Sequence, residues 1–329
     1  MKIIVDAMGG DHAPSEIVAG TVSACKKFGI EAVLVGKEAE IRALLPEDAP
    51  EITILHAEDV ITMEDDPTAL LKAKKESSMA VALRALKDGA GDALVSAGST
   101  GALLVGATMI VKRIPGIRRA ALSPLLPTAK GKALLIDCGA NVECTPEYLL
   151  QFAAMGSHYM QCVMGIDTPR VGLLNNGAEE HKGTPLQQEA YRVLKEAPIH
   201  FVGNIEGRDV ALGAVDVVVT DGFTGNILLK TMEGVGLFFS SELKSIFMKN
   251  LLTKLAAVFV KDGIRSFKKK MDYNETGGAP LLGIAKPVIK AHGSAKEKTF
   301  ESAIAQAITY VEQGIIEKIG KSVESEAKI

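Results

Sequence analysis

Residues 94–107, with the sequence LVSAGSTGALLVGA, decide the fold. A short apolar run enters a Gly-Ser-Thr-Gly turn and is followed by small and apolar residues at helical spacing, which is typical of a strand–turn–helix unit. The turn places the backbone N–H groups of Gly98, Ser99, Thr100 and Gly101 at the end of a buried strand. Because a helix N-terminus offers free N–H groups and the positive end of its dipole, this turn favours an anion such as phosphate. The alternative is a structural turn, since glycine is common wherever a strand turns tightly into a helix.

The same pattern recurs along the chain. Short apolar segments that end in Gly, Asp, Asn or Ser, each followed by a helical pattern, are found at residues 2–6, 32–36, 52–57, 92–98, 132–139, 170–177, 200–204, 216–222 and 287–293. Nearly continuous apolar strands that alternate with helices predict a parallel sheet covered on both faces. We therefore predict an α/β protein, a three-layer α/β/α sandwich with a mostly parallel central sheet, in which residues 1–329 form a single domain.

Residues 238–275 depart from this pattern and are predicted to form a projecting amphipathic helical segment. Helical spacing gathers Leu255 and Phe259 on one face and Lys254, Lys261 and Arg265 on another, and we expect a break at residues 262–263. A helix of this kind is typical of peptides that lie in a membrane interface. The alternative is a helix pair whose apolar face packs in a dimer interface.

Composition narrows the class of protein. With 47% hydrophobic residues and a net charge of −3, the chain can bury a large core, and no basic field indicates a nucleic-acid partner. No apolar run reaches the about 18–20 residues that span a bilayer. The N-terminal MKIIVDAMGG runs directly into a strand, so no signal peptide is expected. Four cysteines without C-x-x-C spacing indicate reduced thiols and a cytoplasmic protein.

The loops after the predicted strands carry the candidate site residues, because ligands of parallel sheets bind at the carboxyl ends of the strands. A second anion-binding turn is predicted at residues 224–226. The polar and glycine candidates in these loops are Asp6, His12, Asn141, Asn176, Lys182, Asp221, Thr224, Gly225 and Asn226. An aspartate at a strand end more often caps the next turn than binds a ligand, so that alternative stays open for Asp6 and Asp221. No spacing shows that carboxylates converge, so neither a metal nor a cofactor is predicted.

Five segments of the chain resemble the signature segments of the bacterial phosphate acyltransferases, the acyl-carrier-protein:phosphate transacylases of phospholipid synthesis. They are KIIVDAMGGDHAP, LVSAGSTGA, IDCGANVECTPEYLLQFA, GLLNNGAEEHKGTPL and VVTDGFTGNILLKTMEG, and the resemblance extends from residue 1 to residues 292–297. It implies a fold like that of isocitrate and isopropylmalate dehydrogenases and phosphotransacetylases, and a homodimer. It also implies transfer of a long-chain acyl group from acyl carrier protein to inorganic phosphate. The acyl phosphate would be used by a membrane glycerol-3-phosphate acyltransferase.

This chemistry suits the loops, because phosphate is itself the nucleophile and the protein needs to supply only proximity and oxyanion stabilisation. As hypotheses, residues 98–101 hold phosphate or the oxyanion, and Lys182 neutralises charge or protonates the departing thiolate. Asn141, Asn176 and Asn226 orient the acyl phosphate, whereas Asp6 and His12 shape the pocket. We take Lys182, Asn141 and Asn226 as the catalytic candidates. Asp221, Thr224 and Gly225 join the candidates for substrate binding.

Acyl carrier proteins are acidic, as the resemblance implies, so their docking surface should be basic and salt-sensitive. Arg118 and Arg119 in the segment KRIPGIRR form one basic patch, and residues 244–270 hold eight Lys or Arg against one Asp. The alternative is that KRIPGIRR is a solvated loop. Two rival functions remain, a transacylase that uses coenzyme A thioesters and a metal- and NAD-dependent dehydrogenase of the same fold. We predict a cytoplasmic enzyme that binds the membrane surface peripherally through the segment 238–275.

Overall fold

The strands form two sheets, in a computed structural model that describes residues 1–271 and 277–326. The first has the order β3-β2-β1-β4-β12-β11-β5 and the second the order β6-β7-β10-β8-β9. The strands of the first sheet are β1 (Lys2–Asp6), β2 (Glu31–Gly36), β3 (Ile52–His56), β4 (Ala93–Ser96), β5 (Ala121–Leu122), β11 (Gly278–Leu282) and β12 (Val288–Ala291). Those of the second are β6 (Leu125–Thr128), β7 (Gly131–Ile136), β8 (Val171–Leu174), β9 (Phe201–Ile205) and β10 (Val217–Val219).

Both sheets are mostly parallel, as predicted. In the first, β3, β2, β1, β4 and β12 run parallel, whereas β11 is antiparallel to β12 and β5. In the second, β7, β10, β8 and β9 run parallel and β6 is an antiparallel edge strand. Every strand predicted from the sequence is present. The prediction of one central sheet is wrong, because the strands divide between two sheets.

The three strands that the sequence did not reveal, β5, β6 and β11, are the antiparallel ones. β5 has only two residues, while β6 contains Pro127 and β11 contains Pro280. Proline has no backbone N–H to donate to a sheet, so a proline inside a short apolar run argues against a strand. β6 tolerates Pro127 because it lies at the sheet edge.

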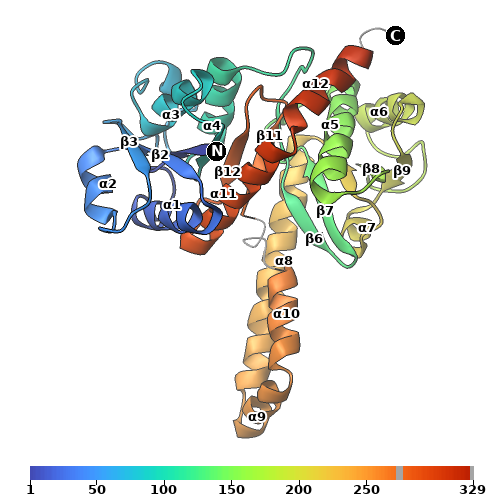
Figure 1. The fold of residues 1–329 in the computed structure, drawn as a ribbon. Helices are drawn as coiled ribbons and strands as arrows, with labels where there is room; N and C mark the ends of the chain where they lie inside the picture. Colours follow the sequence, from blue (N-terminus) through green and yellow to red (C-terminus); the bar gives the residue numbers. More distant parts are fainter. Residues whose placement is uncertain (272–276, 327–329) are drawn as a thin grey trace.

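Helices cover both faces of each sheet (Figure 1). β1 shows why, since Ile3 and Val5 pack in one buried cluster and Ile4 packs in another on the opposite face. The helical elements of the body are α1 (Ser15–Phe28), α2 (Glu38–Leu44), η1 (Ala69–Leu71), α3 (Ser78–Lys87), α4 (Thr100–Gly106), η2 (Ala107–Val111), α5 (Pro146–Met164), α6 (Pro185–Glu196), α7 (Gly207–Leu212), α11 (Glu297–Glu312) and α12 (Ile315–Glu326). The structure is therefore a three-layer α/β sandwich built on two mixed sheets.

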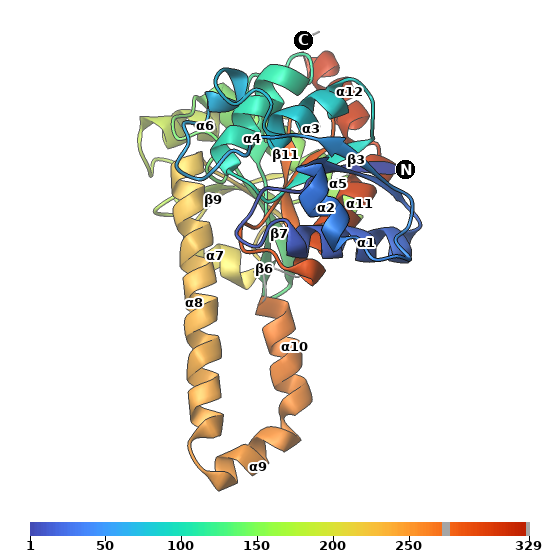
Figure 2. The same cartoon turned by 90° about the vertical axis from the view of Figure 1, so that its left-hand side faces the viewer.

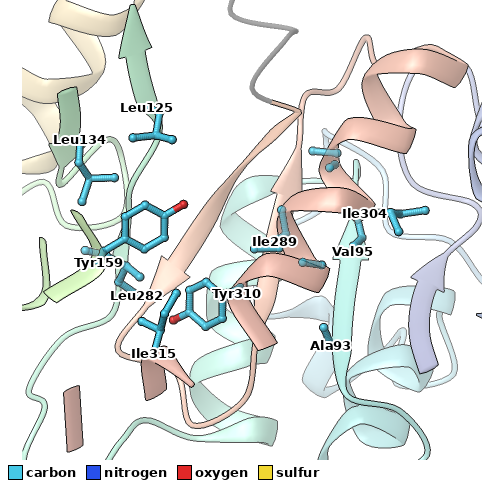
Figure 3. Close-up of a cluster of buried hydrophobic side chains, with 14 of the residues drawn as sticks. Ala93, Val95, Leu125, Leu134, Tyr159, Leu282, Ile289, Ile304, Tyr310 and Ile315 are labelled. Atoms are coloured by element: carbon cyan, nitrogen blue, oxygen red, sulfur yellow. The ribbon is translucent and has the colours of Figure 1, made fainter. Parts of the chain in front are cut away.

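The two sheets share one buried cluster of apolar side chains (Figure 3). Val95 and Ile289 enter it from the first sheet, Leu134 enters it from the second, and Tyr159 of α5 and Tyr310 of α11 lie between them. The two tyrosine rings are 6.3 Å apart between centroids. The cluster is continuous across the two sheets. That residues 1–329 form a single domain stays a prediction.

A helical hairpin extends away from the body (Figures 1 and 2). α8 (Gly222–Met248) leaves the body, α9 (Leu251–Phe259) forms the tip and α10 (Lys261–Met271) runs back. The segment predicted over 238–275 is thus part of a longer hairpin, and its residues 272–275 lie outside the described residues. The break falls at Val260, two residues before the predicted one, and Asp262 lies in the first turn of α10. None of the described helices combines the length and the apolar character needed to cross a bilayer.

Substitution of the two core tyrosines by phenylalanine should have opposite effects on stability. The Tyr159 hydroxyl accepts a hydrogen bond from Gln306 Nε2 at 3.2 Å, whereas the buried Tyr310 hydroxyl has no partner among the described residues. Tyr159→Phe should lower the free energy of unfolding by about 1 kcal/mol. Tyr310→Phe should leave it unchanged or raise it by about 1 kcal/mol, because it removes an unsatisfied buried group. Urea unfolding of both variants measures the difference, and a loss in Tyr310→Phe as large as in Tyr159→Phe contradicts it.

Candidate functional site

A cavity of about 330 Å³ lies between the two sheets. The first sheet contributes Thr100, just after β4, and Lys290 and His292 at the end of β12. The second contributes Gly139, after β7, and Asn226 in the first turns of α8, after β10. The carboxyl ends of four strands therefore meet around one cavity, which is where a parallel α/β fold places its ligand.

Asp6 organises the turn after β4. Its carboxylate is buried and accepts hydrogen bonds from Ser78 Oγ at 2.6 Å and Ser96 Oγ at 2.7 Å. Ser96 Oγ in turn accepts the backbone N–H of Gly98 at 3.1 Å. Burial raises the pKa of Asp6, and the two serine hydrogen bonds oppose that rise. Asp6 therefore shapes the site by holding the turn at residues 98–101.

Within that turn, one predicted residue reaches the cavity. Ser99 is the N-cap of α4 and accepts the backbone N–H of Ala102 at 3.5 Å. Thr100 lines the cavity, and Gly101 lies against Pro67 on another side. α4 continues directly into η2, so the turn opens a helical run from Thr100 to Val111.

The second predicted turn starts α8. Asp221 is the N-cap and accepts both the backbone N–H and the hydroxyl of Thr224, each at 2.8 Å, which is the capping alternative considered above. Gly225 packs directly against the backbone of Asp137, and a Cβ at residue 225 would lie 2.0 Å from the Asp137 carbonyl oxygen. This approach fixes the next residue, Asn226, beside Gly139 at the cavity.

Asp137, at the end of β7, is the counterpart of Asp6 in the second sheet. Its carboxylate accepts the backbone N–H groups of Leu122, Cys138 and Asn141 at 2.6–2.8 Å and Asn141 Nδ2 at 3.1 Å. Burial raises the pKa of Asp137 to about 6, although these hydrogen bonds act to lower it. Asn141 Nδ2 also donates to the carbonyl of Ala120 at 2.8 Å. Asn141 thus joins two loops, and it is not among the residues that line the cavity.

A second cavity of about 610 Å³ lies on another face of α8. Asn226 and Lys230 face the first cavity, whereas Thr224 and Leu228 face the second, as helical spacing of three to four residues requires. Asn176 lines the second cavity, and Lys182 lies beside it, next to Gly183. The structure therefore brings Thr100 and Asn226 together and places Asn176, Lys182 and Thr224 apart from them.

His12 lies in the exposed turn between β1 and α1 and lines neither of these cavities. Its backbone carbonyl accepts the Ser15 hydroxyl at 3.3 Å. The prediction that its side chain shapes the pocket is not supported by this placement.

The sequence analysis missed the charged residues and the histidine of the first cavity. They are Lys230, Glu233, Lys290 and His292. Lys230 Nζ donates to Glu233 at 2.8 Å, and His292 Nδ1 lies 2.8 Å from Ser294 Oγ. The signal for Lys290 was a lysine inside an otherwise apolar strand, and that for Lys230 and Glu233 was their spacing from Asn226 on one helix.

The predicted contact surfaces lie in two places. Arg118 and Arg119 are exposed on the loop between η2 and β5, where Arg119 lies over the Tyr148 ring at 5.4 Å. Ala120, the next residue, is held by Asn141, so this loop adjoins the one that lines the first cavity. Lys254, Leu255, Phe259, Lys261 and Arg265 are exposed at the far end of the hairpin. All four cysteines are free, as predicted.

Comparison with known proteins identifies relatives over the whole chain. A family model described as "Fatty acid synthesis protein" matches residues 1–318. The phosphate acyltransferase of Thermoanaerobacterium thermosaccharolyticum is 49% identical over 324 residues, which cover 98% of this chain and 97% of its own. That of Bacillus cereus is 48% identical over 329 residues, which cover 99% of each.

Solved structures show the same fold at lower identity. A phosphotransacetylase from Streptococcus pyogenes has a TM-score of 0.63 and 20% identity over 94% of each chain. A branched-chain phosphotransacylase from Enterococcus faecalis has a TM-score of 0.57 and 15% identity, covering 94% of this chain and 99% of its own. At such identities the likeness is evidence of the fold alone.

The close approach of α8 to the β7–α5 loop can be tested with two glycines of the same helix. A Cβ at Gly225 would meet the Asp137 carbonyl, whereas one at Gly234 would have nothing within 4 Å. Gly225→Ala should lower the free energy of unfolding by about 3 kcal/mol, since backbone must move. Gly234→Ala should raise it by about 0.5–1 kcal/mol, since alanine favours a helix. Equal unfolding midpoints in urea for the two variants would show that the approach is not tight.

Proposed function

Because this chain belongs to the phosphate acyltransferase family and transfers an acyl group to phosphate for lipid synthesis, we propose that its donor is a long-chain acyl thioester of acyl carrier protein. The reaction takes place in the cavity between the two sheets. The observation that carries this assignment is the meeting of the two predicted turns, through Thr100 and Asn226, at one cavity. The rival dehydrogenase function loses its support, since the curated relatives are phosphate acyltransferases.

The chemistry needs binding and positioning more than a protein nucleophile. A phosphate oxygen attacks the thioester carbon, the C–S bond breaks and the thiol leaves. The turn at residues 98–101 and the Asn226 amide hold phosphate and the developing oxyanion, in a geometry fixed beforehand by Asp6 and Gly225. Apolar side chains in the cavity wall, Leu122 and Leu125, suit the first carbons of an acyl chain.

Lys182 and Asn176 keep their proposed roles in charge neutralisation and in orienting the acyl phosphate. Because they lie at or beside the second cavity, those roles require a substrate that reaches across the first turn of α8. Asp221 and Thr224, hydrogen-bonded to each other at that turn, support it. The pantetheine arm of a carrier-protein thioester is long and carries amides, which suits the Asn and Thr side chains of the second cavity.

The basic loop at Arg118 and Arg119 is the proposed dock for acyl carrier protein. Both side chains are exposed, and the loop is tied to the cavity wall through Asn141. Lys254 of α9 and Lys261 at the start of α10 lie at the far end of the hairpin instead, away from the body that holds the cavity. An acidic carrier at the loop would therefore reach the cavity with its thioester.

Charge reversal at this loop separates carrier protein from coenzyme A as the donor. The double variant Arg118→Glu, Arg119→Glu should raise the KM for a palmitoyl carrier-protein thioester on the order of tenfold at low salt. The KM for palmitoyl coenzyme A should change little. Lys130→Glu, Lys132→Glu is the control, with the same charge change at two exposed lysines of the β6–β7 turn and the start of β7. The proposal is contradicted if acyl phosphate forms from palmitoyl coenzyme A but not from the carrier-protein thioester. It is also contradicted if the KM for the carrier-protein thioester is unchanged in the double variant.

We propose that the hairpin tip binds the membrane surface and that the protein is cytoplasmic and peripherally associated. Phe259 is 92% exposed and Leu252 77% exposed, with Lys254, Lys261 and Arg265 also exposed. Basic residues near an anionic leaflet contribute roughly 1 kcal/mol each, and buried apolar side chains add to this. The acyl phosphate is amphiphilic, so release near a membrane glycerol-3-phosphate acyltransferase would avoid its passage through water.

A homodimer is the proposed assembly. The stem of the hairpin exposes Val235, Phe238 and Phe239 on α8, separate from the tip. A second copy can cover the stem while the tip remains free for a membrane. We also propose that the two-sheet fold is that of isocitrate and isopropylmalate dehydrogenases, which direct superposition on such an enzyme tests.

Vesicle binding tests the role of the tip. Leu255→Glu, Phe259→Glu should abolish co-sedimentation with vesicles of anionic phospholipid, because both side chains would have to enter the interface charged. The matched control is Val202→Glu, Leu212→Glu, which changes two exposed apolar residues of the body. Co-sedimentation of the tip variant at the wild-type level, with its oligomeric state unchanged, assigns membrane binding to another surface.

A further inference from the structure

Lys290 is a buried lysine near the end of β12, a strand whose other residues are apolar. It pairs in register with Ser96 of β4, and Ser96 pairs in register with Asp6 of β1. Residues in register on parallel strands point to the same face of the sheet. Lys290, Ser96 and Asp6 therefore form a polar row at the carboxyl edge of the first sheet, directly below the turn at residues 98–101.

The hydrogen bonds of Lys290 leave one donor for the cavity. Its Nζ donates to the carbonyl of Ala97 at 3.2 Å and to the carbonyl of Ala291. An ammonium has three N–H donors, and these two bonds are the ones it makes within the described residues. The residue is only 7% exposed, yet it lines the cavity with Thr100 and Asn226. A substrate atom in the cavity is thus the partner that the third N–H lacks.

The surroundings make this ammonium a ready proton donor. Burial lowers the pKa of Lys290 to about 8, while the carboxylates of Asp11 and Asp6 oppose the shift and Lys230 adds to it. His292, Glu233 and Cys138 are the other titratable groups among the residues that line this cavity, and burial raises the pKa of the Cys138 thiol to about 12. The remaining elements around Lys290 present uncharged residues to the cavity or the row, Ser96 from β4, Ala279 from β11 and Thr299 from α11. A pKa near 8 is close to that of an alkyl thiol, which suits proton transfer between them.

We infer that Lys290 is a catalytic proton donor, which protonates the sulfur of the departing thiol as the acyl group passes to phosphate. The inference rests on the proposed reaction. A phosphate oxygen forms the new C–O bond, the C–S bond breaks, and its electron pair goes to sulfur. Sulfur takes a proton from the Lys290 ammonium, and the resulting amine takes the proton that the attacking phosphate gives up. Hydrogen phosphate supplies one proton and the thiol receives one, so no further reactant is required.

The other cations of the structure are less suited to this step. Lys230 is paired with Glu233 and is half exposed, so its ammonium is held in a surface ion pair. Lys182 lies beside the second cavity. Burial lowers the pKa of His292, so the imidazole is mostly neutral near pH 7. Lys290 alone among these combines deep burial, a free donor and the cavity shared by both turns.

The test compares two donors that differ in the acidity of the leaving thiol. Palmitoyl N-acetylcysteamine releases an alkyl thiol that needs a proton, whereas palmitoyl thiophenol releases a more acidic aryl thiol that leaves as a thiolate. Lys290→Gln should lower kcat for the alkyl donor by about 100-fold, the lower end for general acid catalysis. For the aryl donor the loss should be under about tenfold. The KM for phosphate should change little with either donor.

Two outcomes overturn the inference. An equal loss with both donors, or a loss confined to the KM for phosphate, assigns Lys290 to structure or to anion binding. Lys182→Ala is the comparison variant and should lose rate equally with both donors. If Lys182→Ala shows the dependence on the leaving thiol instead, the proton donor is Lys182.

A second test uses only the wild-type enzyme, so it does not depend on whether a variant folds. With the alkyl donor kcat should fall above about pH 8, because the donor must be protonated, and with the aryl donor this fall should be absent. The same fall with both donors contradicts the inference. Failure of the proposed function would appear differently, as no acyl phosphate from wild-type enzyme with the carrier-protein thioester.

Discussion

The contact between Gly225 and the Asp137 carbonyl is the constraint on which the site and the hairpin both depend. A side chain at residue 225 cannot fit there, so the first turn of α8 packs directly on the loop after β7. That contact sets the rotation of α8, and with it the direction of Asn226, Lys230 and Glu233 toward the first cavity. The same helix is 27 residues long, about 40 Å at 1.5 Å per residue, and ends near the hairpin tip. One backbone approach therefore positions one wall of the first cavity and a distant apolar surface.

Two buried carboxylates play matching parts in the two sheets. Asp6 ends β1 and holds Ser96 and the turn at Gly98, whereas Asp137 ends β7 and holds the loop at Asn141. Burying a carboxylate is unfavourable, and each is compensated by several hydrogen bonds from groups that line or support the cavity. These hydrogen bonds occupy the N–H groups of Gly98 and Asn141 and hold the two loops in place, so the backbone of Thr100 and Gly139 at the cavity is fixed before any ligand binds.

The sequence revealed the local units and missed what depends on distant pairing. Strand–turn–helix units such as residues 94–107 carry their own signals, in apolar runs, glycine turns and helix caps, so every parallel strand was found. The division into two sheets depends on the antiparallel strands β5, β6 and β11, which are short or interrupted by proline. In the site, Thr100 and Asn226 were found because they belong to glycine-rich turns. Lys290 was missed because its strand pattern is that of a core strand, and the one signal, a lysine inside that strand, does not tell which cavity the lysine lines.

The hairpin differs from the body in how little of it is buried. None of the residues of α9 is buried, and in α8 only Gly222 and Gly225 are, both in the first turn. α9 has 9 residues and α10 has 11, and isolated helices of that length are marginal in water, where most helical stability comes from packing of an apolar face. The tip exposes several large apolar side chains close together in sequence, including Leu251, Leu252 and Phe259, and a contiguous exposed apolar patch is typical of an interaction surface. Contacts outside the described chain are therefore needed to cover this surface, and a lipid interface at the tip with a second copy along the stem would meet that need without competing for the same residues.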